Sequence, residues 1–237
     1  MDYSQFLMMP QELGLLLVFL LVFLFDTFLP KKAQSSLSIF TCVVFALFTV
    51  ANVVMSGTGT SFAGMYEQTE ATYAMKLILN AGMLIVLIQA TKWANSEFVA
   101  VRRGEFYELL LATLLGMYIM ISARHFLLFV IGLETASLPL AALVAFDKKH
   151  YESHEAAAKY MFTAVFSSAI FMLGLSFVYA LAGSLYFNDI AVNIMGGQSA
   201  LLVVALVFVI AGVGFKLSLV PFHLWTADVY QGAPTAV

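Results

Sequence analysis

Long uninterrupted apolar runs limit what this chain can fold into. The hydrocarbon core of a bilayer is about 30 Å thick, and a helix needs about 20 residues to cross it. Runs of nearly that length or longer follow one another at residues 13–29, 37–56, 75–94, 105–123, 125–146, 154–185 and 199–225. They are much longer than the roughly 10 residues of a transmembrane barrel strand, and they lack its alternation. We therefore predict an all-α integral membrane protein with about seven transmembrane helices.

The composition supports lipid as the solvent. Of the 237 residues, 62% are hydrophobic and 11% are charged, whereas soluble domains carry about 25% charged residues. The net charge of −3 is scattered without a basic patch, so nothing indicates a nucleic-acid partner. The chain has one cysteine, Cys42, and no phosphate-binding loop, dinucleotide fingerprint or haem motif. We therefore expect no metal and no cofactor in this chain.

The lysines and arginines predict an orientation. If the helices alternate, Lys76 and Arg124 fall on one side. The other side receives Lys31, Lys32, Lys92, Arg102, Arg103, Lys148 and Lys149. By the positive-inside rule this richer side is cytoplasmic, which places the N-terminus outside. Because the chain begins with Asp2 and Glu12 and not with a basic region, we interpret the first run as a retained helix.

Glu134 is the sharpest functional signal, because it lies near the centre of the fifth run. A carboxylate at that depth is costly unless it is paired, hydrated or protonated. Thr135 and Ser137 are near enough along the chain to hydrogen-bond it, and Pro139 can open the backbone. The alternative is a protonated glutamate that only holds helices together.

Lys216 lies late in the seventh run, five residues before Pro221. If the helix ends near the proline, the lysine snorkels to the headgroups. If the helix breaks inside the membrane and resumes, Lys216 lies deep, where burial destabilises its charged form and makes it a proton carrier. The spacing leaves both alternatives open.

Two further residues are candidates for a proton path. Lys159 lies about five residues into the sixth run, where snorkelling is the simpler explanation. His223 follows Pro221, and its simpler role is a structural hydrogen bond. Taken together, one carboxylate, two lysines and a histidine at a proline break are typical of a proton or ion path. The remaining charges at run ends are interpreted as a helix start (His154, Glu155) or as solvated and interfacial (Asp26, Lys76, Lys92, Glu105, Glu108).

The segment GFKLSLVPFHLWTADVYQGAPT, residues 214–235, resembles the seventh-helix signature of the antiporter-like subunits of respiratory complex I, NADH:quinone oxidoreductase. Its end, residues 228–235, looks most like the subunit N branch, which is called subunit 2 in mitochondria and plastids. The motifs around Glu134 and Pro139, and AAAKY at residues 156–160, also fit. The resemblance follows the whole chain in helix order.

The resemblance implies roles for the candidate residues. Glu134 and Lys216 match the family's key glutamate and helix-break lysine, which form a coupled proton-carrying pair. Lys159 matches a lysine that modulates or connects the path, and His223 matches a histidine on the hydrated route. The chain would then be a proton-translocating membrane-arm subunit of complex I, and so part of an enzyme, driven by quinone reduction elsewhere in the complex. NADH, FMN, iron–sulfur clusters and quinone would be bound by other subunits, and subunits K and M would be neighbours in a bacterial inner membrane.

Family members have about fourteen helices with two inverted five-helix repeats, so the resemblance makes this chain the first part of that fold. We expect residues 1–104 to form an amino-terminal three-helix segment. Residues 105–237 would form an incomplete first repeat, with helices four to seven and an eighth just beginning. Ala227 stands where the family usually has a proline. Two other functions stay open: a subunit of a multisubunit sodium/proton antiporter, and a passive structural scaffold.

Overall fold

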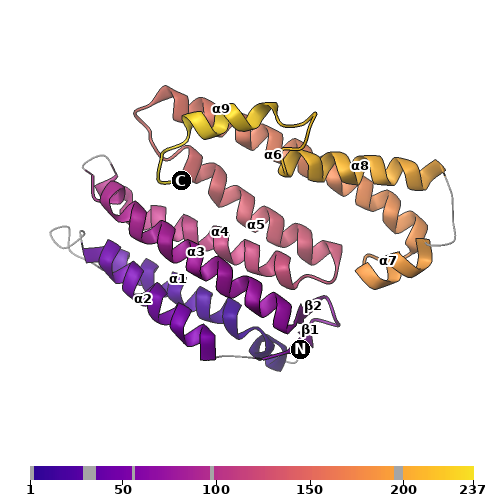
Figure 1. Cartoon of the computed structure of the whole chain (residues 1–237), viewed down its shortest axis with the longest axis horizontal. Coiled ribbons are helices and arrows are strands. Elements are labelled where there is room, and N and C mark those ends of the chain that lie inside the picture. The colour runs from indigo at the N-terminus through magenta and orange to yellow at the C-terminus, as the bar shows by residue number, and fades with distance from the viewer. Residues whose placement is uncertain (1–2, 29–35, 55–56, 97–98, 195–199) are drawn as a thin grey trace. The chain divides into compact units, whose positions relative to one another are not determined.

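The computed structural model describes residues 3–28, 36–54, 57–96, 99–194 and 200–237, and this part of the chain is mostly helical (Figure 1). Six helices are long and apolar enough to cross a membrane, and a shorter apolar helix follows them. They are α1 (Pro10–Phe28), α2 (Ser36–Val54), α3 (Glu70–Ala94), α4 (Arg103–Ser122), α5 (Phe126–Val144), α6 (Tyr151–Ala182) and the shorter α8 (Ala200–Lys216). The predicted membrane fold with about seven spans is confirmed. Lys31 and Lys32, used for the orientation, lie outside the described residues.

Several short elements differ from the sequence prediction. One 3₁₀ helix precedes α1 and another precedes α4. An antiparallel hairpin of two strands occupies the predicted loop before α3, and two short helices flank α8. They are η1 (Tyr3–Met8), β1 (Gly59–Ser61), β2 (Tyr66–Gln68), η3 (Ala100–Arg102), α7 (Phe187–Ile194) and α9 (Leu224–Gly232). The hairpin pairs Gly59 with Gln68 and Ser61 with Tyr66.

Local capping explains two helix boundaries that differ from the apolar runs. Helix α3 begins at Glu70 because Thr69 and Thr72 form a reciprocal capping box before it. Helix α6 ends at Ala182 because Gly183 adopts a left-handed conformation with φ of 69°. At its other end α6 begins at Tyr151, so His154 and Glu155 lie inside the helix and not at its start.

The end of the chain also differs from the prediction. Residues 233–237, where an eighth helix was expected to begin, form a bend and a turn after α9. The expectation of an eighth helix that begins here stays a prediction.

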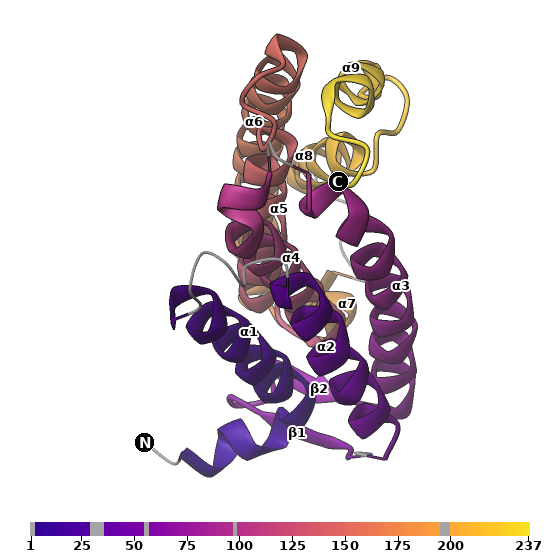
Figure 2. The same cartoon turned by 90° about the vertical axis from the view of Figure 1, so that its left-hand side faces the viewer.

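The chain divides into two compact units. The first contains Met1–Ala123, Leu128–Leu143 and Thr235–Val237, and the second contains Arg124–Leu127 and Val144–Pro234. In the first unit α1 to α4 pack together, and the hairpin lies at one end of α1 to α3 (Figure 2). The predicted boundary at residue 104 separates an amino-terminal segment from a family repeat, and such a boundary need not coincide with a boundary between compact units. It stays a prediction.

Helices α4 and α5 approach each other closely at two glycines. A Cβ built on Gly116 would lie 2.3 Å from the backbone nitrogen of Ala136 and 2.6 Å from the carbonyl oxygen of Gly132. A Cβ on Gly132 would lie 2.7 Å from the backbone nitrogen of Met120. The backbones of α4 and α5 are therefore in direct contact. In lipid, where the hydrophobic effect does not drive helices together, such close packing at small residues stabilises their association through dispersion.

In the second unit, the broken pair α8 and α9 runs antiparallel along α6. Ring contacts join Phe177 to Phe208 at 5.9 Å and Phe166 to Phe215 at 6.1 Å between ring centroids. Farther toward the start of α6, the pairing continues on to α9, where Gly232 packs against the carbonyl of Glu152. One long helix therefore supports both halves of the broken one (Figure 1).

We expect Gly116→Ala to destabilise the first unit, because even a methyl group would force α4 and α5 apart. The matched control is Gly82→Ala on α3, where a Cβ meets nothing within 4 Å; it should be neutral or slightly stabilising, since alanine is the better helix former. The measurement is the thermal unfolding midpoint of each purified variant in detergent. Equal midpoints for the two variants would contradict the close contact.

Candidate functional site

The seventh run contains a broken helix. Helix α8 ends at Lys216, residues 217–223 form turns, and α9 begins at Leu224. Freed backbone carbonyls near the break have partners: the indole N–H of Trp225 donates to the Phe215 carbonyl at 3.2 Å, and the Leu219 N–H donates to the Gly214 carbonyl at 2.9 Å. Of the two alternatives for this run, the structure has the one in which the helix breaks and resumes.

Lys216 lies level with the middle of α6. The neighbouring Phe215 contacts Phe166, which is near the midpoint of the 32-residue helix Tyr151–Ala182. A small cavity of about 30 Å³ lies here, with room for one or two water molecules. Its lining residues are Tyr160, Thr163, Ala164, Ser167, Phe215, Lys216 and Trp225. A snorkelling lysine would instead be level with a helix end.

Lys159 is tied to α9 by an ion pair. Its Nζ lies 2.5 Å from Asp228 Oδ2 on α9 and 2.8 Å from Glu155 Oε1 on its own helix. These groups line a second, larger cavity of about 170 Å³ together with Glu152, Gln231 and neighbouring small residues. Sequence reasoning missed Asp228, because nothing in the chain order shows that it faces a lysine 69 residues earlier.

His223 and Glu134 take different places. His223 is the exposed residue just before α9, and its side chain does not cap that helix. Glu134 is half-buried on α5 in the other compact unit, where the helix continues through Pro139 to Val144. Lys159, Lys216 and His223 therefore lie together in the second compact unit, whereas Glu134 belongs to the first.

The hydroxyls beside Glu134 bond to their own helix. Thr135 Oγ1 donates to the Ile131 carbonyl and Ser137 Oγ donates to the Leu133 carbonyl, both at 2.7 Å. Bonds of this kind are usual for Ser and Thr inside helices, and they satisfy the hydroxyls in an apolar environment.

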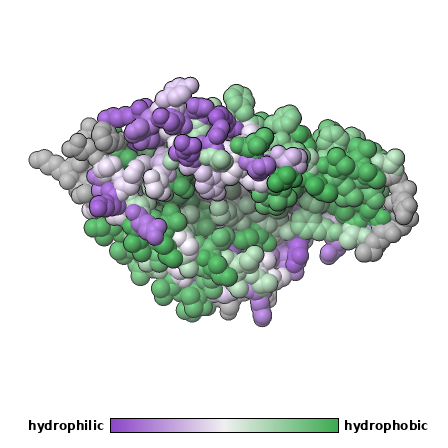
Figure 3. Space-filling view, turned by 45° about the horizontal axis from the view of Figure 1, so that its top comes forward, coloured by the Kyte–Doolittle hydropathy of each residue, from purple (hydrophilic) through white to green (hydrophobic). Residues whose placement is uncertain are grey.

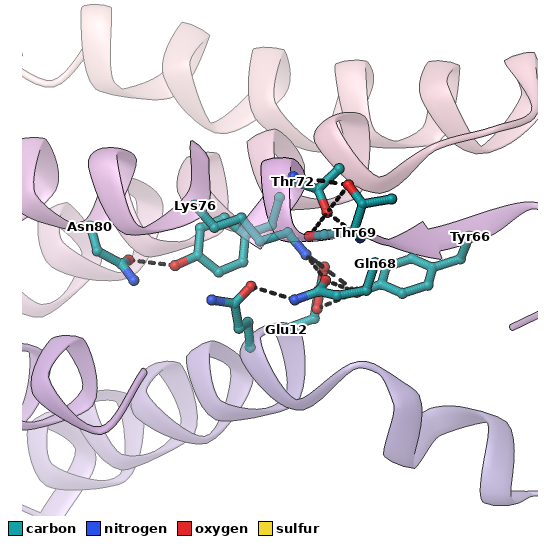
Figure 4. A network of polar contacts seen from close by, with 9 residues as sticks. Glu12, Tyr66, Gln68, Thr69, Thr72, Lys76 and Asn80 are labelled. Atoms are coloured by element: carbon teal, nitrogen blue, oxygen red, sulfur yellow. Dashed lines mark hydrogen bonds and ion pairs between the residues drawn. The ribbon is translucent and has the colours of Figure 1, made fainter. Parts of the chain in front are cut away.

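A buried ion pair that the sequence analysis missed lies in the first unit (Figure 4). Lys76 Nζ lies 2.5 Å from Glu12 Oε1, and their side chains are 0% and 6% exposed. The prediction that Lys76 is solvated or interfacial was therefore wrong. The physical reason is the unexpected hairpin, which brings acceptors for the ammonium group from Tyr66 and Gln68. Of the other predicted surface charges, Lys92 and Glu105 are exposed, while Asp26 and Glu108 are half-buried.

Each charge of the pair is fully hydrogen-bonded. Lys76 donates to Glu12 at 2.5 Å, to Gln68 Oε1 at 2.7 Å and to the Tyr66 hydroxyl at 3.2 Å, which uses its three protons. The Tyr66 hydroxyl lies 2.9 Å from Glu12 Oε2. Burial, and then the nearby Glu12 carboxylate, raise the pKa of Tyr66, so its hydroxyl stays a donor.

The network includes further side chains and extends to α4. Gln68 Nε2 donates to Gln11 Oε1 at 2.8 Å, and the Tyr118 hydroxyl on α4 donates to Asn80 Oδ1 on α3. Lys76 also lies over the Tyr118 ring, 5.5 Å from its centroid. The cluster thus fastens α1, the hairpin, α3 and α4 to one another, which is a structural role.

The chain is similar to known proteins in both sequence and fold. A family model described as "NADH:quinone oxidoreductase/Mrp antiporter, TM" matches residues 123–237. Proteins named NADH-quinone oxidoreductase subunit N from Azobacteroides pseudotrichonymphae genomovar. CFP2 and Phocaeicola vulgatus are 48% and 49% identical to this chain over its whole length. The chain belongs to this family. It spans about half the length of these relatives, 49% and 50%.

Solved structures agree with the family. A chain of respiratory complex I from Thermus thermophilus, determined with bound aureothin, has a TM-score of 0.75 and 30% identity, covering 95% of this chain and 48% of its own length. A chain of an archaeal membrane-bound sulfane sulfur reductase has a TM-score of 0.71 at 19% identity, covering 97% of this chain and 48% of its own length, and shares the fold. The resemblance seen in residues 214–235 is confirmed.

The family match includes all four predicted path residues, Glu134, Lys159, Lys216 and His223, whereas Glu12 and Lys76 lie before it. Among the described residues, no group of three His, Cys, Asp or Glu side chains could hold a metal ion. The candidate site consists of protonatable side chains and two cavities.

We expect either single change, Glu12→Gln or Lys76→Met, to cost about 3–5 kcal/mol in unfolding free energy, because each leaves one buried charge without its partner. The double variant should recover much of this loss, since no buried charge remains. Lys92→Met, at an exposed lysine of the same helix, is the matched control and should change stability by about 0.5 kcal/mol or less. Chemical or thermal unfolding of the purified variants measures this cycle. A double variant that costs the sum of the two single changes would contradict the buried pair.

Proposed function

We propose that this chain is the first part of a proton-translocating membrane subunit of NADH:quinone oxidoreductase, of the subunit N type. The observation that carries the proposal is the helix break after Lys216, next to a water-sized cavity and level with the middle of α6. A lysine at a helix break inside a membrane is a recurrent arrangement in ion-transporting proteins, because the break exposes backbone groups to the path. The relatives named subunit N support the assignment.

In the proposed mechanism, Lys216 is the central proton-exchanging group. Water in the adjacent cavity carries the proton to or from its Nζ, and the surrounding phenylalanine rings make the charged form sensitive to any nearby charge. Glu134 is the carboxylate station of the same path, Lys159 regulates access, and His223 relays protons beside the break.

The chain would act as part of an enzyme and hold no redox centre itself. NADH, FMN, iron–sulfur clusters and quinone would belong to other subunits, and quinone reduction there would drive the proton movement. Subunits K and M are the proposed neighbours in a bacterial inner membrane, with the N-terminus of this chain outside. Lipid covers the apolar faces that no neighbour covers.

A sodium/proton antiporter subunit is the second candidate, because the matching family model includes antiporters. Co-purification separates the two: redox subunits accompany a complex I subunit and not an antiporter. A passive scaffold is separated by the variant described next, since a scaffold needs no protonatable group at position 216.

We expect Lys216→Ala, made in the complete complex, to reduce both NADH-driven proton uptake and NADH:quinone electron flow by an order of magnitude or more. The reason is that alanine removes the titratable group that lines the inner cavity while the cavity remains. Inverted membrane vesicles provide both measurements in one preparation.

The matched control is Lys92→Ala, an exposed lysine at the end of α3, which should leave both rates near the native level. Native gel electrophoresis establishes that each complex assembles. If the assembled Lys216→Ala complex keeps native rates, Lys216 is structural and the proposed path is wrong.

A further inference from the structure

Two cavities lie in sequence along one face of α6. The outer one, of about 170 Å³, is lined by Glu152, Glu155, Ala156 and Lys159, and the inner one, of about 30 Å³, by Tyr160, Thr163, Ala164 and Ser167. These positions recur every three or four residues, which places them on a single stripe of the helix. Helix α9 lines the outer cavity, and Lys216 and Trp225 line the inner one. A route from the outer cavity along this stripe therefore leads to Lys216.

Two side-chain pairs cross from α6 to α9 between the cavities. Lys159 meets Asp228 at 2.5 Å, and one residue farther along α6 the ring of Tyr160 lies 5.7 Å from that of Trp225. Trp225 is held in place by its bond to the Phe215 carbonyl. The charged pair borders the outer cavity and the ring pair borders the inner one, so both lie across the route.

The ion pair is the part of this barrier that can open. The side chains of Lys159 and Asp228 are 41% and 54% exposed, and half-exposed pairs are weak and screened by salt. Lys159 also has a second carboxylate, Glu155, within 2.8 Å on its own helix. The ammonium group can therefore leave Asp228 without losing its charge partner. Figure 3 shows hydrophilic residues gathered over α9 and the start of α6, in contrast to the apolar surface of α8, so this end is the more polar one.

We propose that Lys159 is the gate residue of the route to Lys216: bonded to Asp228 it closes the space between α6 and α9, and bonded to Glu155 alone it opens that space to water. That the route carries protons rests on the proposed function. The opening and closing of the gate is defined by water access alone. Lys159 acts as a positioning residue, since its charge is kept in both states. Asp228 is the closing partner, and Glu155 is the opening partner.

The test measures water access to the inner cavity directly. A reporter cysteine replaces Thr163, which lines that cavity, in a background where Cys42 is changed to serine. The reagent is a positively charged, water-soluble methanethiosulfonate, applied to the complete complex in right-side-out and in inverted vesicles. The parent without the reporter cysteine gives the background rate.

Asp228→Asn and Glu155→Gln form a matched pair, because each removes one negative charge beside the same lysine. We expect Asp228→Asn to raise the labelling rate at position 163 by an order of magnitude. Glu155→Gln should leave the rate unchanged or lower it, because Lys159 then has Asp228 alone. Asp228→Glu keeps a carboxylate and should stay near the native rate. A general effect of charge on the reagent would lower the rate in both neutral variants.

Equal rates in Asp228→Asn and Glu155→Gln would overturn the gate, whatever the proton-pumping assays show. If the Asp228→Asn complex does not assemble, Lys159→Met serves instead, since it removes the same crossing bond and should also raise the rate. The proposed function fails separately, when Lys216→Ala leaves proton uptake intact. Labelling depends on water access and not on pumping, so the two failures are distinguishable.

Discussion

Close backbone packing on α6 holds the second compact unit together. In lipid, apolar side chains gain little by meeting each other, so helices associate through tight contact at small residues. A Cβ on Gly212 of α8 would lie 2.6 Å from the Cβ of Phe171, and one on Gly174 of α6 would lie 2.8 Å from the backbone nitrogen of Val209. These contacts fix α8 against α6, and they thereby decide where along α6 the helix break and Lys216 fall.

The chain holds two lysines in opposite ways. Lys76 has three acceptors, no exposure to solvent and no alternative partner within the described network. It therefore makes a permanent structural contact between the helices and the hairpin. Lys159 has two competing carboxylates and remains partly exposed, so its bonds can be exchanged. Burial strengthens an electrostatic contact and also makes its loss costly. A membrane protein that must be both rigid and switchable benefits from having both kinds in separate units.

The sequence predicted the membrane spans better than it predicted which side chains meet one another. Apolar runs are local, so the helices and the position of Lys216 in its run could be derived from chain order. The Glu12–Lys76 pair could not, because each residue stands near a run end and only the hairpin between them removes water. Asp228 was visible as part of a motif, but its partner Lys159 depends on how α9 folds back along α6. The helix break was one of two open alternatives, and turn geometry after Lys216 decided it.

The length of α6 has a consequence for the surrounding membrane. Its 32 residues rise about 48 Å, which exceeds a hydrocarbon core of about 30 Å. The helix must therefore tilt strongly or project beyond the core, and adjustment of this kind depends on local bilayer thickness. The carboxylates near its first turns mark the end that tolerates water. Bilayer thickness, and with it the lipid species around the protein, would then determine how far the mouth of the route stands above the acyl chains.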